Sequence, residues 1–278
     1  MNFDTIIYQP GKIARLIMNC PENLNAQSRL MLSEIDDAMS MACKDDDVRV
    51  IIVSGAGKHF SAGHDVKEMS GDLAPETRTQ RHERVKRVYI DDHLRWRNAS
   101  KPTIAMVQGY CIWGGWMVAS AMDLLFASED AIFLANPYPA DFWALPWDLP
   151  PKKAKEMLFE HRAIRAREAM EMGFVNRVYP SDRLETETLA YAERVAENNQ
   201  AHVRAIKYII NQTLDAMGYT ASVTNALHAS GMFDFARPDK MNLNPYADFA
   251  DVHDNPHSNL VRKAWERFQA EEAKKQEI

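Results

Sequence analysis

The segment Ile104–Ala127, IAMVQGYCIWGGWMVASAMDLLFA, constrains this chain more than any other. It predicts a buried strand (Ile104–Val107), a turn containing glycine, and a helix that begins at Gly114 and Gly115. Glycine at a strand-to-helix junction lets a backbone N–H approach a ligand without a side chain in the way. A helix start adds amides without intrahelical acceptors and the positive end of the dipole. The segment predicts either a place that holds negative charge or a core helix whose glycines only allow close packing.

A second segment of the same kind lies upstream. Val50–Val53 is an apolar β-branched run, and glycines and the sequence SAGHD (Ser61–Asp65) follow it. An oxyanion hole needs two amide donors from separate loops that converge on one oxygen, and removing one donor typically costs about 3 kcal/mol of transition-state stabilisation. The two segments together therefore indicate a site for a developing oxyanion more strongly than either does alone.

Several short motifs occur in the order and spacing of one family, so the sequence resembles the enoyl-CoA hydratase/isomerase (crotonase) superfamily from about Ile6 to about Gly218. The motifs are Asn25-Ala26, Asp47–Arg49, Gly55–Lys58, Phe60–Asp65, Lys101-Pro102, Gly109-Tyr110, Gly114-Gly115, Asp123-Leu124, Ala166, Ala169, Gly173 and Val175-Asn176. The resemblance implies an α/β fold: a ββα spiral core at residues 1–200 with the acyl-CoA site, and a C-terminal helical trimerisation region at 201–278. It also implies a homotrimer or homohexamer.

The resemblance also implies a site. In this superfamily the thioester carbonyl of an acyl-CoA lies in the oxyanion hole, where its enolate is stabilised. Transferred by motif, the two donors are the backbone N–H groups of His64 and Gly114, and the backbone around Ala62 and Gly63 lies near the adenine and pantetheine of CoA. No cofactor is expected beyond the CoA of the substrate, and the sequence shows no set of metal ligands.

The sequence departs from the hydratases at their acid/base pair, because both hydratase glutamates are missing. The two positions hold Met117 and Tyr138. A pair of carboxylates can orient a water and relay its proton, and neither methionine nor tyrosine can do that work. The sequence therefore predicts a divergent member that does not use the standard two-glutamate hydration.

Three side chains could replace the glutamates. Asp141 is the first candidate for the acid/base, although an aspartate there could also be a surface or capping residue. Tyr138 is the second, as a proton donor or as a packed aromatic. The His64 imidazole titrates near neutral pH and is the third; a histidine after Ser-Ala-Gly, with Trp-Gly-Gly at the second donor, also resembles the methylmalonyl-CoA decarboxylase branch. Asp148 is predicted to cap the next helix.

The loop predicted for Ala131–Trp147 concentrates aromatic residues and prolines. With Trp113 and Trp116 it could form the wall of a site for a bulky acyl group, or it could be an ordinary core or interface cluster. Beyond Gly218 the resemblance fades, and a polar stretch, Arg237–Ser258, separates two helix-like segments.

The length, net charge and cysteine content of the chain restrict the classes of function that it can have. The chain has 278 residues, a formal net charge of −6 and no long basic run, so neither nucleic acid nor a membrane surface is an expected partner. The N-terminus shows no signal pattern and no stretch reaches transmembrane length. Three cysteines without metal spacing indicate free thiols in a reducing compartment. We expect a cytoplasmic protein.

We therefore expect an acyl-CoA-processing enzyme. Hydration or dehydration of a bulky or unusual enoyl-CoA ranks first, because it is the common activity of the superfamily. Hydrolytic C–C cleavage of a β-diketone or cyclic oxo-acyl-CoA follows closely, because the glutamates are missing, and decarboxylation is third. A hypothesis of another class is a binding or scaffold protein that kept the fold and lost the chemistry; the intact SAGHD and Gly-Gly motifs argue against it.

Overall fold

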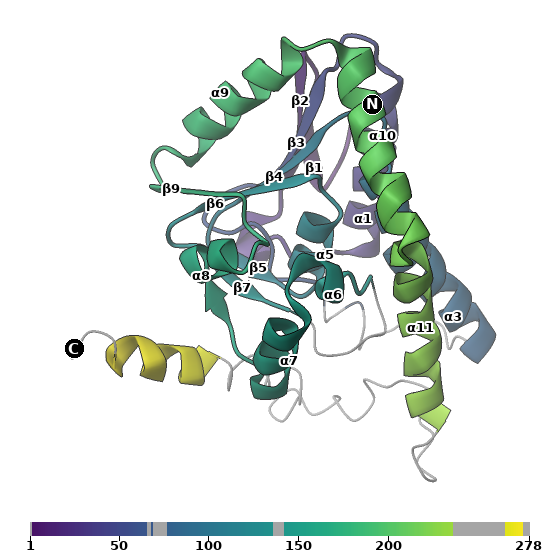
Figure 1. Ribbon diagram of the computed structural model, residues 1–278, viewed down its shortest axis with the longest axis vertical. Coiled ribbons are helices and arrows are strands. Elements are labelled where there is room, and N and C mark those ends of the chain that lie inside the picture. Colours follow the sequence, from purple (N-terminus) through teal and green to yellow (C-terminus); the bar gives the residue numbers. More distant parts are fainter. Residues whose placement is uncertain (1, 66–67, 69–76, 136–141, 236–264, 275–278) are drawn as a thin grey trace.

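The structure, a computed structural model, describes residues 2–65, 68, 77–135, 142–235 and 265–274. Its centre is a sheet of six strands in the order β1-β2-β3-β4-β6-β9 (Figure 1). The first two strands form an antiparallel hairpin, and every later strand pairs in parallel with its neighbour. The bounds are Ile6–Gln9 (β1), Ile13–Met18 (β2), Val50–Gly55 (β3), Thr103–Val107 (β4), Leu124–Ser128 (β6) and Arg177–Tyr179 (β9).

A smaller sheet of three short strands lies partly in segments that we had predicted as a turn and a loop. Its strands are β5 (Tyr110–Ile112), β7 (Ile132–Leu134) and β8 (Ile164–Arg165), in that order. The sequence did not predict them because two or three residues are too few to show the alternation of a strand. The loop predicted for Ala131–Trp147 is thus partly strand, and it also contains the helical turn α6 (Leu145–Asp148).

The helix predicted to begin at Gly114 is present as α5, and further helices follow or separate the strands. The helical elements are a 3₁₀ turn η1 (Pro21–Asn23), α1 (Arg29–Lys44), α3 (Arg78–Val85), η2 (Lys86–Asp91), α4 (Asp92–Arg97), α5 (Gly114–Ser120), α7 (Pro151–Glu160), α8 (Ala166–Glu171), α9 (Leu184–Ala196), α10 (Gln200–Ala216) and α11 (Tyr219–Phe235). Residues 265–274 form a further helix. The mixed α/β fold with a helical C-terminal region is therefore confirmed.

Both faces of the central sheet are covered. On one face Val50, Ile52 and Ile104 pack against α9 through Ala192 and Ala196. The alternate residues of the same strands belong to the main core, which includes the apolar side of α1. Parallel strands that are buried on both faces read as continuous apolar runs, which explains the Val50–Val53 signal in the sequence.

The segment between the first loop of the site and β4 contains three consecutive helical elements. Lys86–Asp91 (η2) is a π-helix between α3 and α4. Such turns are short insertions in α-helices that often occur at functional sites. Here the buried side chains include Val85 at the end of α3, Tyr89 and Ile90 of the π-helix, and His93 and Trp96 of α4. This part of the segment therefore packs against the core.

The last helices lie outside the central sheet. In Figure 1, α10 and α11 form a long column along one side of the molecule. Helix 265–274 packs on the small sheet, where the rings of Trp265 and Tyr110 meet edge to face at 5.6 Å and Arg165 pairs with Glu272 at 2.7 Å. The polar stretch Arg237–Ser258 lies outside the described residues.

Candidate active site

The two glycine-containing loops run side by side. The amide of Ser61 donates to the Tyr110 carbonyl at 2.9 Å, and the amide of Ile112 donates to the Ser61 carbonyl at 3.0 Å. At Gly63 φ is +97°, and a Cβ there would lie 2.9 Å from the Ile112 oxygen and 3.3 Å from the Gly114 nitrogen. Only glycine lets the two loops approach this closely, and the pairing brings the residue after Gly63 next to the start of α5.

That residue is His64, whose imidazole lies against Gly114. A Cβ on Gly114 would lie 2.7 Å from His64 Cε1 and 2.4 Å from Gln27 Oε1. Gln27 holds the same loop from its other side, since its amide donates to the Gly63 carbonyl at 2.7 Å and its carbonyl accepts from the Asp65 amide at 2.9 Å. Gly114 opens α5, and the first amides of a helix have no intrahelical acceptor. The structure thus brings together the two residues predicted to supply the amide donors.

Asn25 holds the same loop in place through hydrogen bonds. This residue is fully buried; its Oδ1 accepts from the Cys20 amide at 2.9 Å and its Nδ2 donates to the carbonyls of Ala56 (2.9 Å) and His59 (2.7 Å). Its own carbonyl accepts from Ser61 Oγ at 2.8 Å. An asparagine amide that satisfies three backbone groups rigidifies a loop, which explains why the sequence motif contains Asn25 although it carries no chemistry.

The predicted CoA-contacting residues already use their amides inside the loop. The Ala62 amide donates to the Leu24 carbonyl at 3.0 Å, and the Gly63 amide donates to Ser61 Oγ at 3.1 Å. Both bonds hold the loop in shape. Any contact of Ala62 and Gly63 with a ligand would therefore use their carbonyl oxygens or their surfaces.

Two buried histidines lie beside this loop. The His64 ring contacts the Tyr89 ring with centroids 4.5 Å apart, and burial lowers the pKa of His64 to about 4. His93 is fully buried between Trp96 (4.4 Å) and Phe142 (5.2 Å); burial first, and the nearby His64 second, lower the pKa of His93 to about 3. Both imidazoles are neutral at pH 7, so His64 is a weak base that can still donate or accept a hydrogen bond.

His93 and Tyr89 were missed by the sequence reasoning. The signal that could have found them is their spacing, because Tyr89, His93 and Trp96 recur at helical intervals on one face of an otherwise charged segment. A face that is aromatic where the rest of the segment is charged indicates burial. The spacing does not predict that this face contacts His64.

Of the two positions where the hydratase glutamates are missing, the structure describes only the first, Met117. Met117 is 3 % exposed and packs in the main core, so an apolar side chain fills the first position. Tyr138 and Asp141 lie outside the described residues. Trp113, directly before Gly114, has φ +47° and ψ −101°. This conformation costs a non-glycine residue on the order of 1–3 kcal/mol.

The cap predicted for Asp148 is wrong. Helix α7 has Pro150 at its N-cap position and no side-chain cap. The Asp148 carboxylate instead accepts hydrogen bonds from Trp116 Nε1 at 2.9 Å and from Ser120 Oγ, both on α5. Burial raises the pKa of Asp148 to about 6, against the lowering effect of these two donors. The sequence did not predict these contacts because 32 residues separate Trp116 from Asp148.

Trp116 itself is a core residue. Its ring stacks on Phe174 with centroids 4.2 Å apart and planes 6° apart, and it meets Phe133 edge to face at 6.0 Å. Of the two readings of the aromatic cluster, packing therefore describes Trp116. Trp113 packs on the smaller cluster that includes Ile132, Leu134 and Phe268.

Fold and site together place the chain in a known class. Residues 9–237 match the enoyl-CoA hydratase/isomerase family. A putative enoyl-CoA hydratase of Mycobacterium tuberculosis is 36% identical over 247 residues, covering 80% of this chain and 78% of that one. A probable mitochondrial enoyl-CoA hydratase of Dictyostelium discoideum is 32% identical over 216 residues, with 74% of each covered.

Solved structures agree. A probable enoyl-CoA hydratase from Mycobacterium thermoresistibile has 40% identity and a TM-score of 0.75, covering 81% of this chain and 94% of that one. An enoyl-CoA hydratase/isomerase from Xanthobacter autotrophicus has 31% identity and a TM-score of 0.80, covering 94% and 98%. The chain belongs to the enoyl-CoA hydratase/isomerase family, a family of acyl-CoA-processing enzymes, and the predicted superfamily is confirmed.

Two features are absent from the described residues. In that part of the chain no helix is long and apolar enough to cross a membrane. Nor do the same residues contain a group of three or more His, Cys, Asp or Glu side chains that could hold a metal ion.

Proposed function

We propose that this protein binds an acyl-CoA thioester and stabilises its enolate with the backbone amides of His64 and Gly114. The observation that carries the proposal is the pairing of the two loops, which puts the Gly114 nitrogen 3.3 Å from the Cβ position of Gly63. Hydrogen bonds from preorganised amides to a developing oxyanion are among the largest contributions to catalysis. The relatives named above support the acyl-CoA as substrate class.

Hydration or dehydration of an enoyl-CoA with a bulky acyl group is the reaction we propose first, because the named relatives are described as enoyl-CoA hydratases. Asp141 would be the acid/base and Tyr138 a second proton donor. Met117 supports a reaction that does not use the usual carboxylate pair, since its side chain is buried and apolar. Hydrolytic C–C cleavage of a β-diketone or cyclic oxo-acyl-CoA fits the same donors.

One observation favours a decarboxylase as the alternative. Decarboxylation makes the enolate without removing a C–H proton, so it needs the oxyanion hole but no strong base. The neutral His64 imidazole lies against Gly114, where it could donate a hydrogen bond to a substrate group. A panel of enoyl-, β-diketo- and malonyl-type CoA esters, assayed with exchange of the α-protons in D₂O, separates these reactions. Absence of CoA-ester binding and of exchange would instead support the scaffold hypothesis.

For the acid/base assignment, we expect Asp141→Asn to lower kcat by about 10²–10⁴-fold, the usual contribution of a general acid or base. The measurement is kcat and KM on the best ester of the panel. The matched control is Asp182→Asn, because Asp182 is exposed and should leave kcat unchanged. Unchanged turnover of Asp141→Asn would remove Asp141 from the mechanism. Tyr138 and His64 would then be the candidates for the acid/base, to be tested with Tyr138→Phe and His64→Ala.

We propose a further role for the loop in holding CoA. Since the amides of Ala62 and Gly63 are used inside the loop, their carbonyl oxygens and exposed surface would meet the adenine and pantetheine. The substrate then supplies the only CoA, and no further cofactor is proposed. The three cysteines, Cys20, Cys43 and Cys111, are free, which supports a reducing compartment such as the cytoplasm.

We also propose a cyclic trimer, alone or stacked as a hexamer. Helix α10 and its C-cap residue expose an apolar row at helical spacing, with Ile206 45%, Ile209 62%, Ile210 53% and the C-cap Met217 67% accessible. Contiguous apolar patches on a protein surface mark interaction sites, and closed cyclic symmetry is the common solution for homo-oligomers.

For the assembly, we expect the double variant Ile209→Glu, Ile210→Glu to convert the trimer into a monomer, because two charges would have to be buried in each contact. Sedimentation velocity measures the change. Gln212→Glu is the control, since Gln212 is exposed on the same helix and adds a charge outside the apolar row. A wild-type monomer, or a trimer that survives the double variant, would contradict the proposed interface.

A further inference from the structure

A single carboxylate oxygen holds two successive turns of α5. Asp148 Oδ2 accepts a hydrogen bond from Trp116 Nε1 at 2.9 Å and another from Ser120 Oγ. Trp116 and Ser120 are four residues apart, so their side chains lie on one face of the helix. Trp116 is 4% exposed, and it follows the Gly114-Gly115 pair directly. The carboxylate therefore acts on the helix that carries the proposed Gly114 donor.

Helix α5 depends on such side-chain contacts. It has seven residues and no side-chain cap at its start, where Trp113 has a positive φ. A helix this short gains little from its own hydrogen bonds. Its orientation is fixed instead by packing, and the Trp116 ring is stacked on Phe174. A small rotation of α5 would move the Gly114 amide away from the thioester oxygen, and a misplacement of about 1 Å can cost roughly 10²-fold in rate.

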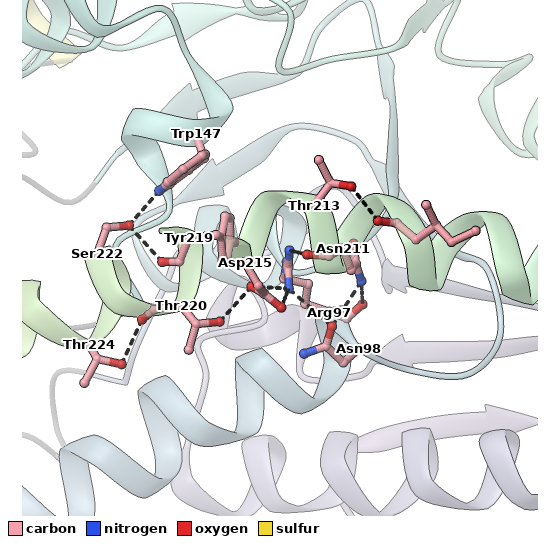
Figure 2. Close-up of polar contacts among 11 residues, drawn as sticks. Arg97, Asn98, Trp147, Asn211, Thr213, Asp215, Tyr219, Thr220, Ser222 and Thr224 are labelled. Atoms are coloured by element: carbon pink, nitrogen blue, oxygen red, sulfur yellow. Dashed lines mark hydrogen bonds and ion pairs between the residues drawn. The ribbon is translucent and has the colours of Figure 1, made fainter. Parts of the chain in front are cut away.

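A second set of contacts holds Trp147, the residue before Asp148, against α11 (Figure 2). Asp148 ends α6, and the preceding residue, Trp147, donates from Nε1 to Ser222 Oγ of α11 at 2.7 Å. The Trp147 ring meets the Tyr219 ring at 5.3 Å, and the Arg97 guanidinium lies 4.0 Å over that same ring. Helix α6 is thus tied to α5 by its aspartate and to α11 by its tryptophan.

The corner between α10 and α11 is itself anchored. Arg97 of α4 pairs with Asp215 at 3.2 Å and donates to the Asn211 carbonyl at 3.2 Å, while Asn211 Nδ2 donates back to the Arg97 carbonyl at 3.2 Å. Figure 2 shows these side chains converging between the helices. The corner therefore gives Trp147, and through it Asp148, a fixed support.

We propose that Asp148 is a positioning residue of the oxyanion hole: through Trp116 and Ser120 its carboxylate holds α5 so that the Gly114 amide points at the thioester oxygen, and the α10–α11 corner holds Asp148. The proposal rests on the function proposed above. Stability alone does not explain the arrangement, because a carboxylate whose pKa is raised by desolvation costs free energy that an apolar contact of similar volume would not.

The test uses ¹³C-carbonyl acetyl-CoA and isotope-edited infrared spectroscopy of the bound ester. Hydrogen bonds from the oxyanion hole lower the C=O stretching frequency of the thioester. We expect the wild type to lower it, and Trp116→Phe and Asp148→Asn to lose half or more of that shift. Trp116→Phe removes the indole N–H and keeps a ring to stack on Phe174. On the best substrate kcat should fall tenfold or more, with KM changed less than threefold.

Glu34→Gln is the matched control. Glu34, on α1, is a buried carboxylate (8% exposed). It accepts hydrogen bonds from the backbone amides of Asp4 at 2.7 Å and Thr5 at 2.8 Å. Its loss should lower the melting temperature and leave the carbonyl shift unchanged.

Each outcome decides something. If Trp116→Phe and Asp148→Asn keep the full carbonyl shift and the kcat of the wild type, Asp148 is only structural and the proposal is overturned. If Glu34→Gln loses as much of the shift as they do, the effect reflects general loss of stability, and the proposal is also overturned. If Asp148→Asn fails to fold, Trp116→Phe decides alone. A wild type that binds acetyl-CoA without any carbonyl shift refutes the oxyanion hole itself, which is a separate failure of the proposed function.

Discussion

Gly114→Ala should abolish most of the catalytic activity, lowering the rate of α-proton exchange of a bound acyl-CoA by about 10²–10³-fold. The added Cβ would stand 2.4 Å from Gln27 Oε1, 2.7 Å from His64 Cε1 and 2.8 Å from His64 Nδ1. Real Cβ atoms do not approach this closely. The Gln27 and His64 side chains are both buried and have little room to yield, so we expect α5 or the His64 loop to move. Either movement separates the two amides, and loss of one donor of an oxyanion hole costs about 2.7–4 kcal/mol.

The control for this variant is Gly173→Ala. Gly173 has φ +92°, and a Cβ there would meet nothing within 4 Å. The strain of a left-handed residue should lower its unfolding free energy by about 1 kcal/mol without any effect on exchange. Exchange rates in D₂O and thermal melting of both variants give the comparison. If Gly114→Ala melts like the wild type and exchanges within threefold of it, the Gly114 amide is not a donor.

The reason the backbone part of the site was predictable is that it depends on glycine. Gly63 is needed where two main chains cross at contact distance, and Gly114 is needed where the Gln27 and His64 side chains pack against the start of α5. The glycine motifs in the sequence therefore identify both loops of the site. The pairing of Ser61 with Tyr110 and Ile112 then follows from the two loops having to converge.

The side-chain part of the site was less predictable, for a physical reason. Asp148 contacts α5, and His93 contacts Phe142 as well as Trp96 of its own helix, so the surroundings of both residues depend on tertiary packing. Capping was the local interpretation for Asp148, and it failed because Trp116 and Ser120 supply better donors from α5. The strands of the small sheet were missed for a different reason, since each is only two or three residues long.

The neutral state of His64 links these two parts. Its imidazole is held against Gly114 by the same loop pairing that places its amide, so the backbone geometry and the low pKa have one cause, burial between the loops. A buried neutral imidazole can polarise or orient a substrate group at pH 7 without carrying charge. If Asp141 is the acid/base, His64 then shapes the acyl site and leaves proton transfer to the carboxylate.

The buried histidines should make the protein labile to acid. The pKa of His93 is about 3 and that of His64 about 4, against about 6.5 in an unfolded chain. A histidine with a lowered pKa stabilises the fold fully above pH 6.5, and this stabilisation is lost as the pH falls toward its folded pKa. At 1.36 kcal/mol per pKa unit, His93 loses about 3 kcal/mol between pH 6.5 and 4.5.

Asp148 acts in the opposite direction. Its pKa is raised to about 6, so acidification from pH 6 toward 4 stabilises the fold by protonating it. The histidine contribution is therefore best isolated by comparing a variant with the wild type, because the carboxylates then cancel. We expect His93→Phe, which keeps a ring between Trp96 and Phe142, to gain about 3 kcal/mol relative to the wild type between pH 7 and 4.5.

Urea unfolding at pH 7, 5.5 and 4.5 measures this difference. His202→Gln is the control, because His202 is exposed on α10 and its substitution should shift the wild-type curve by the same amount at every pH. His64→Phe should behave like His93→Phe over the same range, since its folded pKa is also below 4.5. If the His93→Phe and wild-type curves stay parallel to within about 1 kcal/mol from pH 7 to 4.5, then His93 is not held neutral by burial. The packing of α4 against the His64 loop would then admit water to the imidazole.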